Sequence, residues 1–303
     1  MRIAIYGSGG VGGYFGARLA ASGNTVHFIA RGAHLDAIRK NGLKVESGAG
    51  NLHIRPANAT HDPASIGPVD VVMFAVKLWD VVAVAKQLAP LLHERTLVIP
   101  LQNGIEAPET VGGIIGKTHV LGGVAYIATG IKEPGVILHT GAMQRMQVGS
   151  GAESFVQACK AAGINIEQPA DIERARWEKF VFLTGMSGAT TIARAPLGVV
   201  RAEPDLRWLL EEAMRETWRL GRKRGIALAE DFVTERMRFV DTLHADMGTS
   251  MQHDLEKGNR LEAPWLCGAV ARMSAEAGLE APVNRTIYAA LRPFVDGPPV
   301  KAA

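Results

Sequence analysis

The sequence contains little cysteine. Its 2 cysteines, Cys159 and Cys267, lie far apart and have no neighbouring Cys or His at the spacing of a zinc site or a redox pair. This argues against a disulfide-stapled scaffold and suggests no metal ligands. We therefore expect two free thiols in a reducing compartment.

Long hydrophobic runs are also missing. The first residues carry one basic side chain and too short an apolar run for a secretory signal. The apolar stretch at residues 69–79 is interrupted by Lys77, well short of the roughly 20 residues that span a bilayer. We therefore expect a cytoplasmic protein without a membrane partner.

Neither sign of charge predominates. Lys and Arg total 33 against 30 Asp and Glu, a formal charge of +3, and the basic residues form no run. Nucleic acid is therefore not an expected partner. The chain of 303 residues, 47% of them hydrophobic and 21% charged, has a soluble globular composition and a length that suits two domains of about 150 residues each.

The first half of the sequence alternates short apolar runs with helical patterns. Several runs are apolar at both alternating positions, which is typical of parallel strands covered on both faces. A more polar stretch, residues 131–150, is predicted to be antiparallel and to extend the same sheet at one edge. The predicted strands are residues 2–7, 25–30, 69–76, 96–101 and 119–127, and the predicted helices are residues 11–22 and 78–93.

The pattern becomes helical in the second half. Apolar residues recur at spacings of three and four within residues 205–225, 229–247 and 263–278. The predicted fold is an α/β Rossmann-type N-terminal domain, residues 1–169, followed by an all-α C-terminal domain, residues 170–303.

A G-x-G-x-x-G pattern follows the first predicted strand. Alone the pattern is weak, but here it lies between a strand and a helix in a β-α-β unit, as dinucleotide binding requires. Its glycines permit a tight turn, close approach of a pyrophosphate, and packing of the helix on the strand. The alternative is a glycine turn that only packs. The predicted cofactor loop comprises Gly7, Ser8, Gly9, Gly10, Val11 and Gly12.

The end of the second predicted strand indicates which dinucleotide binds. An Asp or Glu at this place hydrogen-bonds the ribose hydroxyls of NAD, whereas this strand ends in Ala30-Arg31. A missing carboxylate and a guanidinium favour the 2′-phosphate of NADP. The other interpretation of Arg31 is a solvated loop residue.

Together with the glycine loop and Arg31, three further motifs resemble the ketopantoate reductase (2-dehydropantoate 2-reductase) family. They are Val-Lys-Leu-Trp at Lys77, Gln-Asn-Gly at Asn103 and Arg-Trp-Glu-Lys ending at Lys179. The resemblance covers essentially the whole chain. It implies a Rossmann domain, a helical domain, and NADPH-dependent reduction of a 2-oxo acid bound in the cleft between them.

The same resemblance implies roles for single residues. Lys179 matches the catalytic lysine, which protonates the carbonyl oxygen as hydride reaches the carbonyl carbon, and Glu262 matches a glutamate that engages the substrate hydroxyl and steadies the lysine. Ser250 matches a serine that contacts the substrate carboxylate, and Lys77 and Asn103 match residues at the nicotinamide end of the cleft. Taken singly, each has an ordinary alternative as a solvated helix residue or part of a turn.

The helix that carries Lys179 departs from the family pattern. Asn is usual four and eight residues after the lysine, and here these substrate-binding positions hold Leu183 and Ser187. Met247 stands where the family often has a polar residue. Since each lost hydrogen bond costs on the order of 1 kcal/mol, the departures are compatible with a changed substrate and unchanged chemistry.

The leading prediction is NADPH-dependent reduction of 2-dehydropantoate (ketopantoate) to pantoate, a step of pantothenate biosynthesis. A second hypothesis keeps the enzyme class but takes another, less polar 2-oxo or β-hydroxy acid. A third is a dinucleotide-binding regulator that has lost catalysis, which the presence of both Lys179 and Glu262 disfavours. We also expect a homodimer formed through the helical domain.

Overall fold

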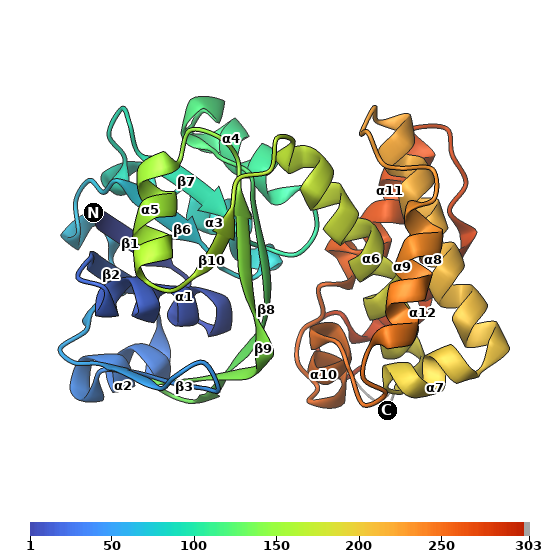
Figure 1. The fold of residues 1–303 in the computed structure, drawn as a ribbon, viewed down its shortest axis with the longest axis horizontal. Coiled ribbons are helices and arrows are strands. Elements are labelled where there is room, and N and C mark those ends of the chain that lie inside the picture. The colour runs from blue at the N-terminus through green and yellow to red at the C-terminus, as the bar shows by residue number, and fades with distance from the viewer. Residues whose placement is uncertain (300–303) are drawn as a thin grey trace. The chain divides into compact units, whose positions relative to one another are not determined.

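A computed structural model describes residues 1–299 and divides into two compact units (Figure 1). The first unit comprises Met1–Ala175, and the second begins at Arg176. The division falls inside helix α6 (Ile172–Ala193), a few residues beyond the predicted boundary. Residues 300–303, the end of the predicted helical domain, lie outside the described part of the chain.

A five-stranded parallel sheet forms the centre of the first unit. Its strands are β1 (Arg2–Tyr6), β2 (Thr25–Ile29), β5 (Asn58–Thr60), β6 (Val71–Phe74) and β7 (Leu97–Pro100). Their order is β5-β2-β1-β6-β7 and every neighbouring pair is parallel, which confirms the Rossmann-type prediction. The chain runs from β1 to one edge and then returns to β6, so the topological switch point lies between β1 and β6. Only β5 was not predicted.

A second sheet corrects the expectation that residues 119–127 and 131–150 belong to the parallel sheet. Strand β9 (Val136–Val148) takes up most of residues 131–150 and is antiparallel to β8 (Gly123–Glu133), which contains part of the strand predicted at residues 119–127; Gly135 in the turn between them has φ of +82°. However, β9 pairs with β3 and β10 instead of extending the first sheet. These short partner strands, which carry little sequence signal, decide where the hairpin lies. The strands are β3 (Leu43–Ser47), β4 (Leu52–Ile54), β8 (Gly123–Glu133), β9 (Val136–Val148) and β10 (Asn165–Glu167).

Helix α1 (Gly10–Ala21) packs against both sheets. A Cβ on Gly16 would lie 2.7 Å from Ile5 of β1, and a Cβ on Gly13 would lie 2.8 Å from Ile137 of β9. Because real side chains do not approach so closely, glycines on α1 allow the helix to touch both sheets. This contact holds the helix start, which follows the glycine loop, in a fixed place.

The segment 78–93, predicted as one helix, is broken into short turns. A 3-10 turn at Leu78–Asp80 leads into helix α3 (Val81–Ala85), and another 3-10 turn follows at Ala89–Leu91. Pro90 lacks a backbone N–H and disfavours helical backbone in the residue before it, which explains the break. The other helices of this unit are α2 (Gly32–Asn41), α4 (Ala107–Ile115) and α5 (Glu153–Ala161).

The second unit contains helices and no strands among residues 176–299, as predicted. The predicted helix 229–247 ends early, at Thr242, so Met247 lies beyond it and is exposed. No helix in the described part of the chain is both long and apolar enough to span a bilayer. After α6 come α7 (Leu197–Ala202), α8 (Pro204–Lys223), α9 (Phe232–Thr242), α10 (Ser250–Glu256), α11 (Cys267–Glu276) and α12 (Pro282–Leu291).

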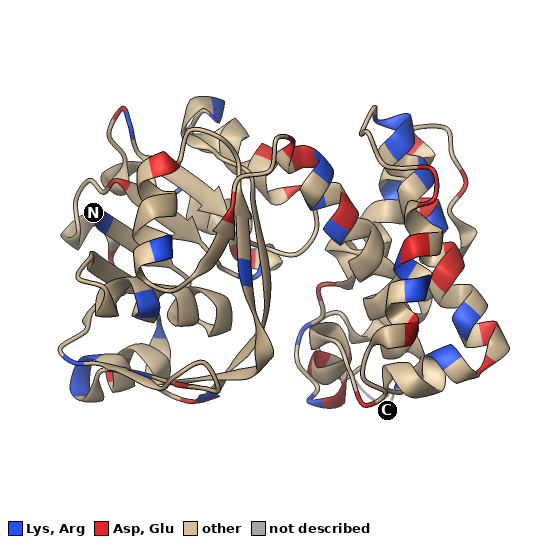
Figure 2. Ribbon diagram, viewed as in Figure 1, with Lys and Arg blue, Asp and Glu red and all other residues tan. Residues whose placement is uncertain are grey.

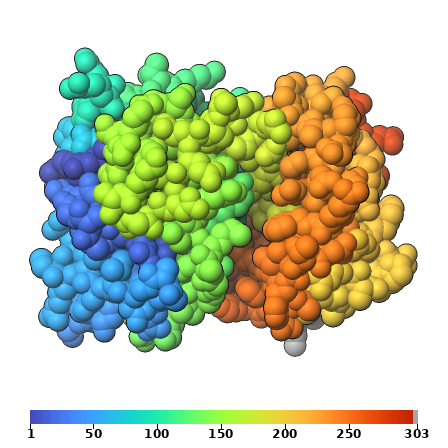
Figure 3. Space-filling model, viewed as in Figure 1, coloured from blue at the N-terminus to red at the C-terminus, as the bar shows by residue number. Residues whose placement is uncertain are grey.

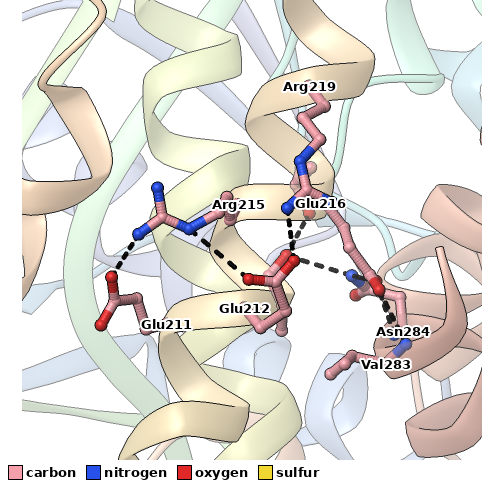
Figure 4. A network of polar contacts seen from close by, with 9 residues as sticks. Glu211, Glu212, Arg215, Glu216, Arg219, Val283 and Asn284 are labelled. Carbon is pink, nitrogen blue, oxygen red and sulfur yellow. Dashed lines mark hydrogen bonds and ion pairs between the residues drawn. The ribbon is translucent and has the colours of Figure 1, made fainter. Parts of the chain in front are cut away.

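A buried carboxylate joins α8 to α12 (Figure 4). Glu216 is 1% exposed and accepts hydrogen bonds from the backbone N–H groups of Val283 and Asn284, each at 2.8 Å. These N–H groups belong to the first turn of α12, where backbone donors lack partners within the helix. In turn, α8 contacts α6 through a hydrogen bond of 2.9 Å between the hydroxyls of Thr217 and Thr184. The helix that carries Lys179 is therefore held by a polar network in the interior of this unit.

Charged residues are interspersed along the helices and loops of each unit (Figure 2). In the space-filling view, the segment around α5, in yellow-green, covers part of the visible face of the first unit, and the α9–α10 segment, in orange, covers part of that of the second (Figure 3). Charge of both signs on the same elements agrees with the near-balanced composition of the sequence.

Candidate active site

The glycine loop follows β1 at the carboxyl edge of the parallel sheet. Gly7 has φ of +95°, and a Cβ there would lie 2.7 Å from the backbone of Ala75, the residue after β6. A Cβ on Gly12 would overlap the carbonyl oxygen of Gly7. Side chains are excluded at both positions, so these two glycines set the shape of the loop.

Gly9 differs from these glycines, because nothing lies within 4 Å of the place that a Cβ would occupy. It is the N-cap of α1, has no side-chain cap hydrogen bond, and precedes a first turn without acidic residues. Backbone N–H groups at such a helix start suit an anion. The loop therefore fits the pyrophosphate of a dinucleotide, which would lie in the open space beside Gly9.

Ser8 is buried and stabilises the glycine loop through hydrogen bonds. Its hydroxyl donates to the carbonyl of Ile29 at 3.1 Å, and its own carbonyl accepts from His34 Nε2 at 2.8 Å. His34 Nδ1 accepts from the N–H of Gly135 at 3.0 Å, so the ring is neutral with its proton on Nε2. Burial lowers the pKa of His34, which favours this neutral form. The sequence did not indicate His34, because a lone histidine in a helix carries no signal.

Arg31 has a carboxylate partner that the sequence did not predict. Arg31 is the N-cap of α2, directly after β2, and its guanidinium lies 2.7 Å from Asp80 Oδ2. Asp80 ends the 3-10 turn that follows β6. The cationic side chain is thus at the expected end of β2, but it is engaged by an anion of the protein itself.

Lys77 and Asn103 follow the neighbouring strands β6 and β7. Because the carboxyl ends of parallel strands meet at one edge, both residues come to the edge of the sheet that holds the glycine loop. Gln102, which the sequence did not single out beyond its place in the Gln-Asn-Gly motif, donates to the carbonyls of Phe74 and Val76 at 3.0 and 3.1 Å. It thereby ties the segment of Asn103 to the segment of Lys77.

Helix α6 presents Lys179, Leu183 and Ser187 on one face, because they are spaced by four residues. Thr190 continues this face and shares a hydrogen bond of 2.9 Å with Thr249. Thr249 is the N-cap of α10, whose first residue is Ser250. The predicted substrate-binding Ser250, which is exposed, therefore lies next to the end of the face that Lys179 begins.

Two buried polar atoms near this face lack hydrogen-bond partners in the described chain. They are Oγ of Ser187, a residue 1% exposed, and Oε1 of Gln252 in α10. Gln252 is next to the Thr190–Thr249 contact, since its N–H donates to Thr249 Oγ1. Buried polar atoms are nearly always hydrogen-bonded, so these two are suited to receive polar groups of a ligand.

Lys179 and Glu262, the two predicted catalytic residues, interact electrostatically. Burial lowers the pKa of Lys179 from its usual 10.5 to about 8, and the attraction of Glu262 opposes this shift. Glu262 is itself 9% exposed, between the fully buried Leu261 and Ala263. An ammonium with such a pKa can release its proton near neutral pH, as a general acid must.

Comparison with known proteins identifies the family. The family description "Ketopantoate reductase PanE/ApbA" matches residues 3–153, and "Ketopantoate reductase PanE/ApbA C terminal" matches residues 171–295. The chain belongs to the ketopantoate reductase family. This membership confirms the resemblance on which the catalytic assignments rest, and it makes the chain an oxidoreductase of a family that uses NADPH.

Known relatives align with this chain along nearly its whole length. It is 31% identical to the 2-dehydropantoate 2-reductase of Archaeoglobus fulgidus, with 98% of each chain covered. It is 30% identical to the uncharacterized oxidoreductase YkpB of Bacillus subtilis, over 97% of this chain and 99% of that one. The crystal structure of 2-dehydropantoate 2-reductase from Geobacter metallireducens matches with a TM-score of 0.90 and 30% identity, over 96% of this chain and 99% of that one.

Proposed function

We propose that this protein reduces a small 2-oxo acid with NADPH, and that ketopantoate, reduced to pantoate for pantothenate biosynthesis, is its substrate. The observation that carries the proposal is Lys179, held with a pKa of about 8 in the electrostatic field of Glu262. Curated relatives named 2-dehydropantoate 2-reductase, 27% and 31% identical over nearly all of the chain, support the choice of substrate.

Different residues are assigned to cofactor binding and to protonation of the substrate. The glycine loop and Arg31 would hold the dinucleotide by its phosphates, and its nicotinamide, when bound, would supply hydride for the carbonyl carbon. Lys179 gives its proton to the carbonyl oxygen, so that the product is an alcohol and no free alkoxide forms. Glu262 orients the ammonium and accepts a hydrogen bond from a substrate hydroxyl, and the hydroxyl of Ser250 donates to the substrate carboxylate.

This proton transfer predicts a pH dependence. Only the ammonium form of Lys179 can act as the acid, so the rate of reduction should be constant below about pH 8 and fall about tenfold per pH unit above it. The reverse oxidation needs the neutral amine and should rise over the same range. The measurement is kcat against pH in both directions.

The variant Glu262→Gln tests the electrostatic coupling between Glu262 and Lys179. Glu262→Gln removes the charge that raises the pKa of Lys179, so the midpoint of the pH profile should move to lower pH. Glu280→Gln, which changes an exposed carboxylate of the same unit, is the matched control and should leave the midpoint in place. An unmoved midpoint in Glu262→Gln would show that the carboxylate does not act on the lysine.

Leu183 favours a second, less polar 2-oxo acid as substrate. It lies on the face of α6 that carries Lys179, where an apolar side chain cannot hydrogen-bond a hydroxyl-bearing substrate. If the substrate differs, Leu183→Asn combined with Ser187→Asn should raise kcat/KM for ketopantoate by about tenfold, the value of one to two hydrogen bonds. Ala275→Asn, at an exposed site on α11 of the same unit, controls for effects of the amide alone. No increase in a variant that melts like the parent protein counts against this alternative and leaves ketopantoate as the substrate.

The proposal includes a homodimer formed through the helical unit. Trp208 of α8 is 59% exposed and Val199 of the adjoining α7 is 49% exposed, and exposed large apolar side chains favour contact surfaces. A relative from Staphylococcus aureus, 25% identical with a TM-score of 0.81, is described as a dimeric ketopantoate reductase. Analytical ultracentrifugation should give twice the mass of the chain, and Trp208→Ser should weaken the association. A monomer at micromolar concentration would refute the dimer.

A cytoplasmic location also belongs to this proposal. Cys159 and Cys267 are buried and form no disulfide. Burial raises the pKa of each thiol to about 12, so neither is a reactive thiolate. Two such thiols suit a reducing compartment.

A further inference from the structure

Arg31 and Asp80 meet across the carboxyl end of β1. Arg31 follows β2, Asp80 closes the turn after β6, and β1 lies between these two strands. Neighbouring strands are about 4.8 Å apart, so the ion pair bridges two strand spacings at the edge where the glycine loop begins. The separation of its atoms, 2.7 Å, is that of a charge-assisted hydrogen bond.

Asp80 is the more firmly placed member of the pair. Its side chain is 23% exposed, against 80% for Arg31. Its backbone N–H donates to the carbonyl of Lys77 at 2.9 Å, which closes the 3-10 turn and fixes where the carboxylate projects. The guanidinium is therefore the more exposed partner, and it contacts a carboxylate carried by a hydrogen-bonded turn.

We propose that Asp80 determines dinucleotide specificity by supplying the carboxylate that the end of β2 lacks, so that the protein binds NADH as well as NADPH. The inference rests on the proposed dinucleotide-binding function. A carboxylate beside the end of the second strand accepts hydrogen bonds from the ribose hydroxyls of NADH, and Asp80 brings one there from the loop after β6.

The same carboxylate opposes NADPH. The 2′-phosphate and the Asp80 carboxylate are both anions that can pair with the guanidinium of Arg31. The phosphate must therefore displace Asp80 from Arg31 when NADPH binds. Once bound, the phosphate lies near a carboxylate of the same sign of charge. Asp80 thus lowers the affinity for NADPH and raises the affinity for NADH, and the sequence rule that relies on the end of the second strand alone overestimates the preference for NADP.

The test is to measure the Kd of each reduced dinucleotide by nucleotide fluorescence in the parent protein and in Asp80→Asn. In the variant, the Kd of NADPH should fall about fivefold, the upper value of an exposed ion pair. The Kd of NADH should rise about tenfold, because the charged acceptor of the ribose hydroxyls becomes a neutral amide oxygen, which accepts a weaker hydrogen bond. Asp36→Asn is the matched control: Asp36 is exposed on α2, close in sequence to Arg31, and its replacement changes the net charge equally. It should leave the ratio of the two Kd values unchanged.

Two outcomes would overturn the inference in different ways. If Asp80→Asn weakens NADPH binding and leaves NADH binding as it was, Asp80 orients Arg31 for the phosphate and does not compete with it. If both Kd values stay at those of the parent protein, Asp80 has no part in specificity. Both outcomes leave the dinucleotide site intact, whereas a parent protein that binds neither nucleotide would refute the proposed function itself.

Discussion

Lys179→Ala is expected to lower kcat for 2-oxo acid reduction by about 10²–10⁴-fold, the usual contribution of a positioned proton donor. The Kd of NADPH should not change, because the glycine loop and Arg31 belong to the other unit of the chain. Steady-state kinetics together with a fluorescence titration of NADPH separate the two quantities.

Two further variants make this result specific. Lys179→Arg keeps a positive charge but replaces a group with a pKa of about 8 by a guanidinium that hardly releases its proton, so it should not restore the rate. Lys223→Ala removes an exposed lysine from α8 of the same unit and should have no effect. If Lys179→Ala turns over like the parent protein, another group donates the proton and the assignment of Lys179 is wrong.

Gly9→Leu should abolish tight NADPH binding while the protein still folds. The place of a Cβ at Gly9 is open, so the fold has room for the new side chain, but that side chain would fill the space proposed for the pyrophosphate. The expected rise in Kd is about 100-fold or more, which corresponds to two lost hydrogen bonds to a charged group at about 1.5 kcal/mol each. Fluorescence titration measures the Kd, and thermal melting reports the fold.

Substitutions at two other glycines serve as controls for Gly9→Leu. Gly113→Leu places the same side chain at an open, exposed position of α4, and should change neither binding nor fold. Gly12→Ala should instead lower the melting temperature, because its Cβ would overlap the carbonyl oxygen of Gly7. Normal NADPH binding by Gly9→Leu would mean that the phosphates lie elsewhere.

The parallel sheet and the helices of the second unit could be predicted, since both give strong periodic patterns. Strand β6 is apolar throughout and β1 is apolar after Arg2, and α8 has an apolar stripe that ends near Gly225, where φ is +83°. The second sheet could not be predicted, because its pairing depends on β3, β4 and β10, strands of five or three residues. The polar pattern of residues 131–150 suggests antiparallel pairing, but it shows neither that β8 is the partner strand nor which sheet the two strands join.

The candidate site, too, could be predicted from the sequence only in part. Gly7, Gly9 and Gly12 follow from a local motif, and Lys179 and Glu262 follow from the family resemblance. Asp80, Gln102 and His34 could not be predicted, because each acts on a segment distant in the sequence: Asp80 on Arg31, Gln102 on the end of β6, and His34 on the glycine loop and the β8–β9 turn. Their roles come from how the strands meet at one edge of the sheet, which no local pattern records.

The central claim is that hydride passes from NADPH to the carbonyl carbon of a 2-oxo acid while Lys179 protonates the oxygen. The most direct measurement incubates the protein with ketopantoate and NADPH that carries deuterium at both C4 positions of the nicotinamide, and analyses the product by mass spectrometry. We predict pantoate with one deuterium at C2 for each NADPH consumed, formed about 10²–10⁴-fold more slowly by Lys179→Ala. If the protein binds NADPH but forms no deuterated hydroxy acid from ketopantoate or from a panel of less polar 2-oxo acids, the claim is wrong, and the chain is a dinucleotide-binding protein without reductase activity.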